Sequence, residues 1–457
     1  MDKHLLSVGL DVGTTTTQMV LSQLVIQNKG SSFSVPELEI AQRKILYKSP
    51  IHFTPLLGKD RVDGDRTRIL VEEEYHAAGI DRQQVDTGAI IITGETSRKE
   101  NARTVLDSLS EFAGDFVVAT AGPHLESVLA AKGAGADLFS AETGKTVLHM
   151  DIGGGTANLS LIRKGDIVAT GCMNVGGRLV KTDESGIITY RSPVLDGYFP
   201  FEVGQKIPQQ AMDELCITLA KALEMAAGLE SATSLLSAFW TAEAGAPWIP
   251  PADVDTISFS GGVAECIDKI HSPFEFGDIG PALGQAIKRS RLCQKEYRLG
   301  SETIRATVIG AGCHSAQLSG STVYHRGIAF PLKNLPVVAV SSQEQISSEL
   351  PALIQQKMEI QEGLSVLALP GFSAAHYSQI TALADALSTV VFPGPVLLAL
   401  QADMAKALGH ALALRLPQEK PILCIDRVKL PSNAYLDVGA PVGSALPVVI
   451  KTLILEK

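Results

Sequence analysis

Two glycine-containing turns constrain the fold of this chain more than any other feature. The first begins at Asp11 and continues through Val12 to Gly13, and the second begins at Asp151 and continues through Ile152 to Gly153. Apolar runs flank both turns, which predicts a strand, a tight turn and a second strand at each place. Glycine allows positive φ and has no side chain, so the backbone can approach a phosphate closely. Successive N–H groups in such a turn bind anions.

The two turns together predict a clamp that holds a nucleotide triphosphate from both sides. The expected phosphate contacts, one set on each turn, are Gly13, Thr14 and Thr15, and Gly153, Gly154, Gly155 and Thr156. Asp11 and Asp151 are expected to hold Mg²⁺, mainly through water, because carboxylate oxygen is a ligand that Mg²⁺ prefers. A lone Asp-x-Gly-Thr turn would equally fit an ordinary hairpin, so the prediction depends on there being two.

A third segment supports the clamp. Residues 256–264 are predicted as an apolar strand that ends in Ser260, Gly261 and Gly262 and leads into a helix. The exposed backbone of Gly261 and Gly262 is expected to pack against the nucleoside.

The order of these three segments resembles that of the actin, sugar-kinase and Hsp70 superfamily, and residues 153–156 are most similar to the Hsp70 form. The resemblance covers about residues 5–290. It implies an actin-like α/β fold, with two ribonuclease H-like lobes around a nucleotide cleft. Residues 122–135 and 278–287 resemble the two helices at the hinge between the lobes. One departure is Asn158, where the Hsp70 pattern usually has an acid.

Glu126 is the predicted catalytic residue. It lies near the start of the first hinge helix, where members of the superfamily often carry an acid that orients the attacking water. The alternative is an exposed carboxylate near a helix N-terminus, where the helix dipole favours it. Glu95 is a weaker candidate for the same role.

The last third of the chain alternates predicted strands and helices, which indicates a further α/β unit with a mostly parallel sheet. We therefore predict a first lobe at residues 1–140, a second lobe at 141–325 and a C-terminal α/β domain at 326–457. Residues 310–314, which begin Gly-Ala-Gly, are predicted as a turn after an apolar strand, either a close backbone approach or a plain strand-to-helix turn.

Composition limits the classes of partner. The formal net charge is −10 and no basic tract stands out, which disfavours nucleic-acid binding. The six cysteines have no metal-ligand spacing, no apolar run is long enough to span a membrane, and the N-terminus lacks the pattern of a signal peptide. We expect a cytoplasmic protein, with association with a bacterial microcompartment as an open alternative.

Over nearly its whole length the chain resembles the reactivating factors of ethanolamine ammonia-lyase, the EutA family. The similar segments are residues 93–102, 310–317, 435–439 and 447–453, together with the two turns. The resemblance implies a chaperone-like ATPase that uses ATP and Mg²⁺ to release damaged cobalamin from inactivated ethanolamine ammonia-lyase holoenzyme. Intact adenosylcobalamin then binds. The chain has no Asp-x-His-x-x-Gly cobalamin motif, so it need not bind cobalamin itself.

Two other functions stay open at this point. One is a small-molecule kinase of the same superfamily, which needs a general base beside an acceptor pocket. The other is a scaffold that binds ATP without hydrolysing it. The sequence also leaves homo-oligomerisation open.

Overall fold

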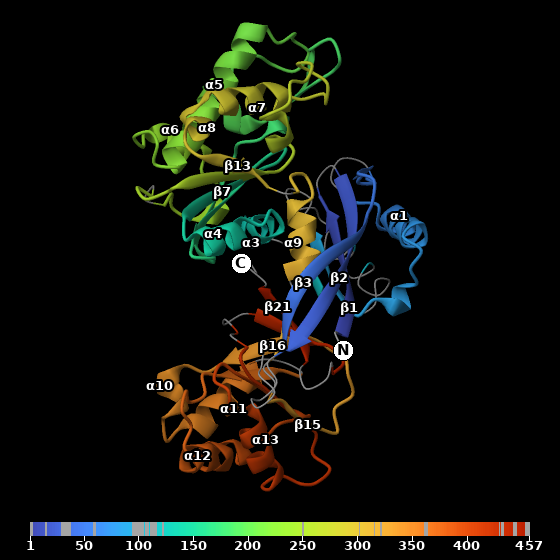
Figure 1. The fold of residues 1–457 in the computed structure, drawn as a ribbon, viewed down its shortest axis with the longest axis vertical. Coiled ribbons are helices and arrows are strands. Elements are labelled where there is room, and N and C mark those ends of the chain that lie inside the picture. The colour runs from blue at the N-terminus through green and yellow to red at the C-terminus, as the bar shows by residue number, and fades with distance from the viewer. Residues whose placement is uncertain are drawn as a thin grey trace.

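The computed structural model shows three parts, stacked along the long axis of the molecule (Figure 1). The first lobe lies in the middle, the second lobe at one end and a C-terminal unit at the other. The structure describes residues 3–13, 16–28, 38–57, 61–93, 105, 109, 117–120, 123–248, 251–300, 302–314, 316–319, 322–360, 364–428, 430, 434–441 and 446–452. Residues 98–113, whose apolar spacing predicts an amphipathic helix, lie almost entirely outside them.

The first lobe is built on a sheet of order β3-β2-β1-β5-β6, with the short β4 paired to β2. Its strands are β1 (Lys3–Val12), β2 (Thr16–Asn28), β3 (Leu38–Lys48), β4 (His52–Phe53), β5 (Thr87–Ile92) and β6 (Val117–Thr120). The strands β1, β2 and β3 are antiparallel neighbours, whereas β5 and β6 run parallel to β1. α1 (Gly64–Ala77) and the short η1 (Arg82–Gln84) complete the described elements.

Alternation along the strands explains the two-sided burial of this sheet. Ile90 and Ile92 of β5 join one apolar core, and Ala89 and Ile91 join the core on the opposite face. Successive side chains of a strand point to opposite faces. The apolar run at residues 89–93 predicts a strand buried on both faces, and the structure confirms this prediction.

The second lobe repeats the same arrangement, with a sheet of order β9-β8-β7-β12-β13. Its strands are β7 (Thr146–Ile152), β8 (Ala157–Arg163), β9 (Asp166–Met173), β12 (Thr256–Ser260) and β13 (Tyr297–Leu299). Again three antiparallel strands are followed by two that run parallel to the first. The two predicted strand-turn-strand units are thus the first hairpins of two matching sheets.

Helices and a small hairpin surround the second sheet. The helices are α4 (Ala136–Thr143), α5 (Gln209–Ala226), α6 (Ser234–Phe239), α7 (Gly280–Arg289) and α8 (Arg291–Gln294), and the 3-10 turns are η3 (Gly177–Leu179), η4 (Pro193–Leu195), η5 (Ala242–Ala244) and η6 (Ala264–Cys266). The turn signals in residues 176–207 predict a small β-rich insertion. The antiparallel pair β10 (Val180–Thr182) and β11 (Ile188–Arg191) confirms it.

Two helices cross between the lobes, and each covers the sheet of the other lobe. α3 (Pro123–Gly133) follows β6 of the first sheet and packs on β7, β8 and β9 of the second. α9 (Ala306–His314) follows β13 of the second sheet and packs on β1, β2 and β5 of the first. The two helices also contact each other extensively, and they lie side by side at the centre of the molecule (Figure 1).

Glycines bring these helices together. A Cβ at Gly133 would overlap the carbonyl oxygen of Ala306, and a Cβ at Gly310 would overlap that of Leu129. A Cβ at Gly312 would lie 2.8 Å from the backbone nitrogen of Gly9 in β1. The prediction of a turn at residues 310–314 is therefore wrong, because those residues lie inside α9. The small residues among them let the backbone of α9 approach its neighbours closely.

The assignment of the hinge helices was half correct. The first predicted helix, residues 122–135, corresponds to α3. The second, residues 278–287, corresponds to α7, which packs on α5, α8, η3 and η6 within the second lobe. The structure gives the second crossing position to α9 instead, because α9 alone directly follows the last strand of the second sheet. The domain boundary predicted near residue 325 stays a prediction. α9 lies within the range predicted for the second lobe, yet it packs on the sheet of the first lobe.

The C-terminal unit contains an eight-stranded sheet of order β14-β21-β20-β16-β17-β18-β19-β15. Its strands are β14 (Ala316–Leu318), β15 (Tyr324–Arg326), β16 (Leu332–Ala339), β17 (Val366–Leu369), β18 (Val396–Leu400), β19 (Ile422–Ile425), β20 (Ala434–Val438) and β21 (Pro447–Thr452), and its helices are α10 (Ser342–Gln345), α11 (Leu350–Ile360), α12 (Tyr377–Ser388) and α13 (Ala405–Ala413). Only β16 to β19 run parallel. The sheet is therefore mixed, and the prediction of a mostly parallel sheet was wrong.

Among the described helices, none combines the length and the apolar character needed to cross a membrane.

Candidate functional site

The first turn closes with a short hydrogen bond across its base. Val12 of β1 pairs with Thr17 of β2, and the Gly13 N–H donates to the Thr16 carbonyl oxygen at 2.9 Å. The Thr54 hydroxyl donates to the Gly13 carbonyl oxygen at 2.7 Å and holds the turn from outside. Thr14 and Thr15 lie outside the described residues, so their phosphate contacts stay a prediction.

The second turn closes in the same way. Ile152 of β7 pairs with Ala157 of β8, and the Gly153 N–H donates to the Thr156 carbonyl oxygen, also at 2.9 Å. The space beside Gly155 is open. The two turns are therefore equivalent in position within their sheets and in hydrogen bonding.

The glycines of these turns leave space beside the backbone because they carry no side chain. Gly13, Gly153, Gly154 and Gly155 are not among the glycines with positive φ, so the lack of a side chain is what matters at these positions. A Cβ at Gly154 would lie 3.1 Å from the Arg178 Cδ atom, which is tighter than ordinary packing.

Arg178 is a residue of this site that no sequence motif indicates. The backbone N–H of Arg178 donates to the Gly154 carbonyl oxygen at 2.6 Å. The backbone N–H of Gly177 donates to the Gly153 carbonyl oxygen at 3.1 Å. η3 is thus fastened to the second turn. The Arg178 Nε atom lies 3.4 Å from Asp278 Oδ2, and about a third of its side chain is exposed. This arrangement places a cation directly beside the turn.

The third predicted segment lies against the second turn. Ser260 of β12 is the register partner of Asp151 of β7. Gly261 has a φ of +89°, and a Cβ there would overlap the carbonyl oxygen of Ile152. A glycine is therefore required at position 261, because the backbone has a positive φ and because the Ile152 carbonyl lies where a side chain would begin. Gly262, in contrast, borders open space.

Asp11 and Asp151 occupy equivalent positions near the ends of β1 and β7. The Thr93 hydroxyl donates to Asp11 Oδ1 at 2.7 Å, and Thr93 directly follows β5. Burial, opposed by the hydrogen bond from Thr93 and assisted by the charges of Glu126 and Asp151, raises the pKa of Asp11 to about 7. Burial also raises the pKa of Asp151 to about 6, opposed by hydrogen bonds from Ser260 and Thr307.

These carboxylates suit a hydrated divalent cation. The described groups that act on them are hydroxyls and other acids, and a cation between them would favour their ionised forms. Within the described residues, no three His, Cys, Asp or Glu side chains converge on a single point as direct ligands would. Carboxylate oxygen is a ligand that Mg²⁺ prefers, and Mg²⁺ usually keeps several of its waters.

Glu126 lies in the first turn of α3, as predicted, and it is buried rather than exposed. Its Oε2 atom accepts a 2.8 Å hydrogen bond from the Asn158 amide. Asn158 is the register partner of Asp151 in the β7–β8 hairpin. The asparagine that departs from the Hsp70 pattern therefore holds Glu126 next to the second turn. The catalytic role of Glu126 stays a prediction, and Glu95 lies outside the described residues.

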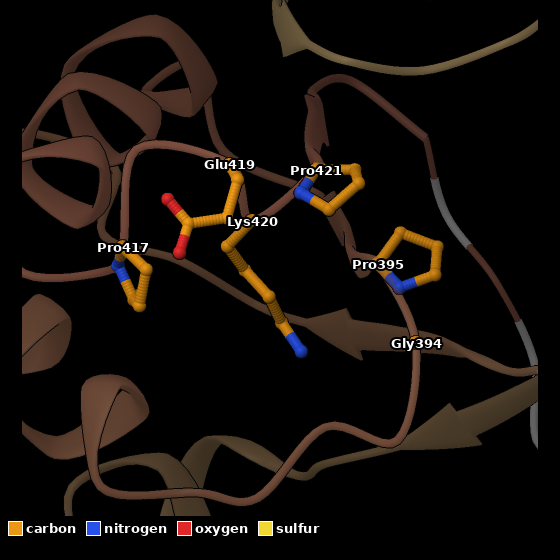
Figure 2. A pocket seen from close by; sticks show the side chains of 6 residues that line it. All are labelled: Gly394, Pro395, Pro417, Glu419, Lys420 and Pro421. Carbon is orange, nitrogen blue, oxygen red and sulfur yellow. The ribbon is translucent and has the colours of Figure 1, made fainter.

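The C-terminal unit has a separate pocket of about 370 Å³ at one end of β18 and β19. It is lined by Gly394, Pro395, Pro417, Glu419, Lys420 and Pro421. In Figure 2, Pro417 lies on one side and Pro395 on the other, with the Lys420 side chain extending between them. The Lys420 ammonium donates to the Phe392 carbonyl oxygen at 2.7 Å, so its charge is already engaged. None of the predicted site residues lies here.

The duplicated sheet, the crossed helices and the two matched turns define a protein of the actin-like class, with two ribonuclease H-like lobes. A third, α/β unit follows the two lobes.

The sequence comparisons identify the family within this class. The family model "Ethanolamine utilisation protein EutA" matches residues 3–456. The chain is 40% identical over 473 residues to the ethanolamine ammonia-lyase reactivase EutA of Escherichia coli strain K12, covering 99% of this chain and 98% of that protein. It is 38% identical over 476 residues to the reactivase of the same name from Salmonella typhimurium strain LT2, with the same coverage. The chain belongs to the EutA family.

Solved structures show more distant likenesses. The Ppx/GppA family member of Aquifex aeolicus has a TM-score of 0.41 and 12% identity, covering 67% of this chain and 97% of that one. The ethanolamine utilisation protein EutJ of Carboxydothermus hydrogenoformans has a TM-score of 0.33 and 18% identity, covering 67% of this chain and 88% of that one. The fold assignment rests on the strand order given above rather than on these likenesses.

Proposed function

We propose that this chain is an ATP-dependent reactivating factor for ethanolamine ammonia-lyase. In this proposal it binds the inactivated holoenzyme in the cytoplasm and releases the damaged cobalamin. Intact adenosylcobalamin then enters the vacated site. The observation that carries the proposal is the relationship to two ethanolamine ammonia-lyase reactivases over nearly the whole of each chain. That relationship includes the C-terminal unit as well as the two lobes.

The nucleotide would lie between the two matched turns. Backbone N–H groups from Gly13 to Thr15 would contact the phosphates from the first lobe, and those from Gly153 to Thr156 from the second. Asp11 and Asp151 would hold the waters of Mg²⁺, and Gly261 with Gly262 would pack against the nucleoside. Bound ATP with Mg²⁺ supplies a hydrolysable phosphoanhydride bond.

Glu126 would orient the water that attacks the terminal phosphate. Its Oε2 atom is held by Asn158, and its charge acts on Asp11 across the boundary between the lobes. A carboxylate fixed in this way can accept a proton from water at the site. Arg178, beside Gly154, would stabilise the negative charge of the phosphates.

Movement of the lobes would couple the nucleotide to the partner enzyme. β14 and β21 of the C-terminal unit contact β3 and β6 of the first lobe, and α9 leads directly into β14. The C-terminal unit is therefore joined to the first lobe, and closure would move the second lobe relative to both. ATP can shift this equilibrium only as far as it binds one state more tightly than the other.

Recovery of lyase activity tests the proposal. Ethanolamine ammonia-lyase carrying cobalamin without its adenosyl group is incubated with this chain, Mg²⁺ and intact adenosylcobalamin, with and without ATP. We expect ethanolamine deamination to return only with ATP, and not with the Asp151→Asn variant. Wild-type chain that gives no ATP-dependent recovery would overturn the proposal.

Nucleotide measurements on the same samples separate the alternatives. Hydrolysis that requires a small acceptor, and yields a phosphorylated metabolite, would favour a kinase. Tight ATP binding with neither turnover nor recovery would favour a scaffold.

A further inference from the structure

A buried polar stripe runs along two neighbouring strands of the second sheet and ends at Asp151. The parallel register pairs Ser258 of β12 with His149 of β7, and Ser260 with Asp151. Alternate residues of a strand share a face, so these four side chains lie on the same side of the sheet. His149, Ser258 and Ser260 have no exposed surface.

The four side chains form a continuous chain of hydrogen bonds. Ser258 Oγ lies 3.1 Å from His149 Nδ1, and His149 Nε2 lies 3.0 Å from Ser260 Oγ. Ser260 Oγ then donates a hydrogen bond to Asp151 Oδ1. The second carboxylate oxygen, Oδ2, has a longer contact of 3.4 Å from the Thr307 hydroxyl.

Counting hydrogens fixes the direction of this chain. A serine hydroxyl has one proton, and that of Ser260 goes to Asp151. The facing Nε2 atom of His149 must therefore donate to Ser260. In a neutral imidazole the Nδ1 atom then accepts from Ser258. Every hydrogen bond in the chain points toward Asp151.

We propose that His149 is a positioning residue that, through Ser260, fixes the Asp151 carboxylate with Oδ1 engaged and Oδ2 left for the hydrated Mg²⁺. The role in magnesium binding rests on the proposed function, whereas the direction of the hydrogen bonds does not. His149 is not an acid or base in this account. Burial, assisted by the charge of Arg298, lowers the pKa of His149 to about 3.

Two substitutions at one position separate positioning from packing. Phe in place of His149 fills the same space but donates nothing, so His149→Phe leaves Ser260 free to rotate. Gln can restore the donor toward Ser260 in His149→Gln. Removing partners that orient metal ligands typically costs 10–100-fold in affinity. We expect His149→Phe to weaken magnesium-dependent ATP binding by about tenfold, and His149→Gln to recover most of that loss.

The experiment combines titration calorimetry of ATP, with and without Mg²⁺, and ¹⁵N NMR of the histidine side chains in the wild-type chain. We expect the Nε2–H tautomer at His149. We also expect His149→Phe to bind ATP more weakly than wild type in the presence of Mg²⁺, and equally well when Mg²⁺ is omitted. If His149→Phe does not fold, Ser260→Ala breaks the same link and should show the same loss. An Nδ1–H tautomer, or wild-type magnesium dependence in both variants, would overturn the proposal. A wild-type chain with the Nε2–H tautomer that binds no ATP would instead refute the proposed function, and with it the magnesium role of His149.

Discussion

The charge of Asp151 raises the pKa of Asp11, although the two residues are 140 positions apart and belong to different sheets. Each lies near the end of the first strand of its hairpin, directly before a turn with the same closing hydrogen bond. The fold thus brings two equivalent carboxylates into electrostatic contact across the boundary between the lobes.

Asp11 should destabilise the nucleotide-free protein at high pH. Its folded-state pKa of about 7 lies above the ordinary value of 3.8, so the folded state binds more protons than the unfolded state between these values. Stability therefore falls as pH rises toward 7, and the loss is complete above it. Asp11→Asn should raise the free energy of unfolding at pH 8 by about 1 to 3 kcal/mol, after allowance for partial exposure. The gain should shrink toward pH 5.

Urea unfolding at pH 5 and pH 8 without Mg²⁺ measures this effect. Asp183→Asn is the matched control, because Asp183 is exposed and hydrogen bonds from Ser185 lower its pKa. The free energy of unfolding of Asp183→Asn should not rise relative to wild type between pH 5 and pH 8. Equal stability of Asp11→Asn and wild type at pH 8 would contradict the burial argument.

Gly261 and Gly262 should respond differently to alanine. Gly261→Ala introduces a Cβ at a φ of +89° and against the Ile152 carbonyl, so we expect a loss of at least about 2 kcal/mol in stability. Gly262→Ala meets open space and should leave stability unchanged. It should nevertheless weaken ATP binding if the nucleoside packs on that backbone. Thermal unfolding and ATP titration of both variants check this, and a stable Gly261→Ala variant would refute it.

Gly310→Ala should destabilise the helix crossing in spite of a better helix propensity. Alanine is favoured over glycine inside a helix by about 1 kcal/mol. The new methyl group would, however, overlap the Leu129 carbonyl of α3, and backbone cannot move aside easily. We expect a net loss of at least about 1 kcal/mol, measured by chemical unfolding. A net gain would show that α3 and α9 do not pack as closely as described.

Glu126→Gln should slow ATP hydrolysis by about 100-fold or more, because a general base contributes that much. ATP affinity should change little, since the residue lies on α3 and not on a phosphate turn. Asn158→Ala removes the amide that holds Glu126 and should slow hydrolysis less. Single-turnover kinetics on the two variants measure this. Wild-type turnover in Glu126→Gln would assign the water-orienting role elsewhere.

The sequence predicted the local units of this fold because they are encoded locally. The strand-turn-strand around Asp11 is recognisable from alternating apolar residues and a glycine turn within 20 positions. The same holds for the β7–β8 hairpin.

What the sequence did not predict depends on long-range packing. Gly310 and Gly312 indicated a turn by intrinsic propensity, yet their contacts with α3 and β1 make a helix possible there. The polar stripe of His149 and Ser260 requires the parallel register of β7 and β12, which are more than 100 residues apart. Alternation of polar residues in these otherwise apolar strands is a signal that could have suggested it.

The most direct test of the account is a double-mutant cycle on the two turns. Titration of ATP and Mg²⁺ into the wild-type chain, Asp11→Asn, Asp151→Asn and the double variant measures whether both turns hold one nucleotide. We predict one ATP per chain, a marked loss of magnesium-dependent affinity in each single variant, and little further loss in the double variant. Additive losses, or wild-type affinity in either single variant, would contradict a single site shared by the two lobes.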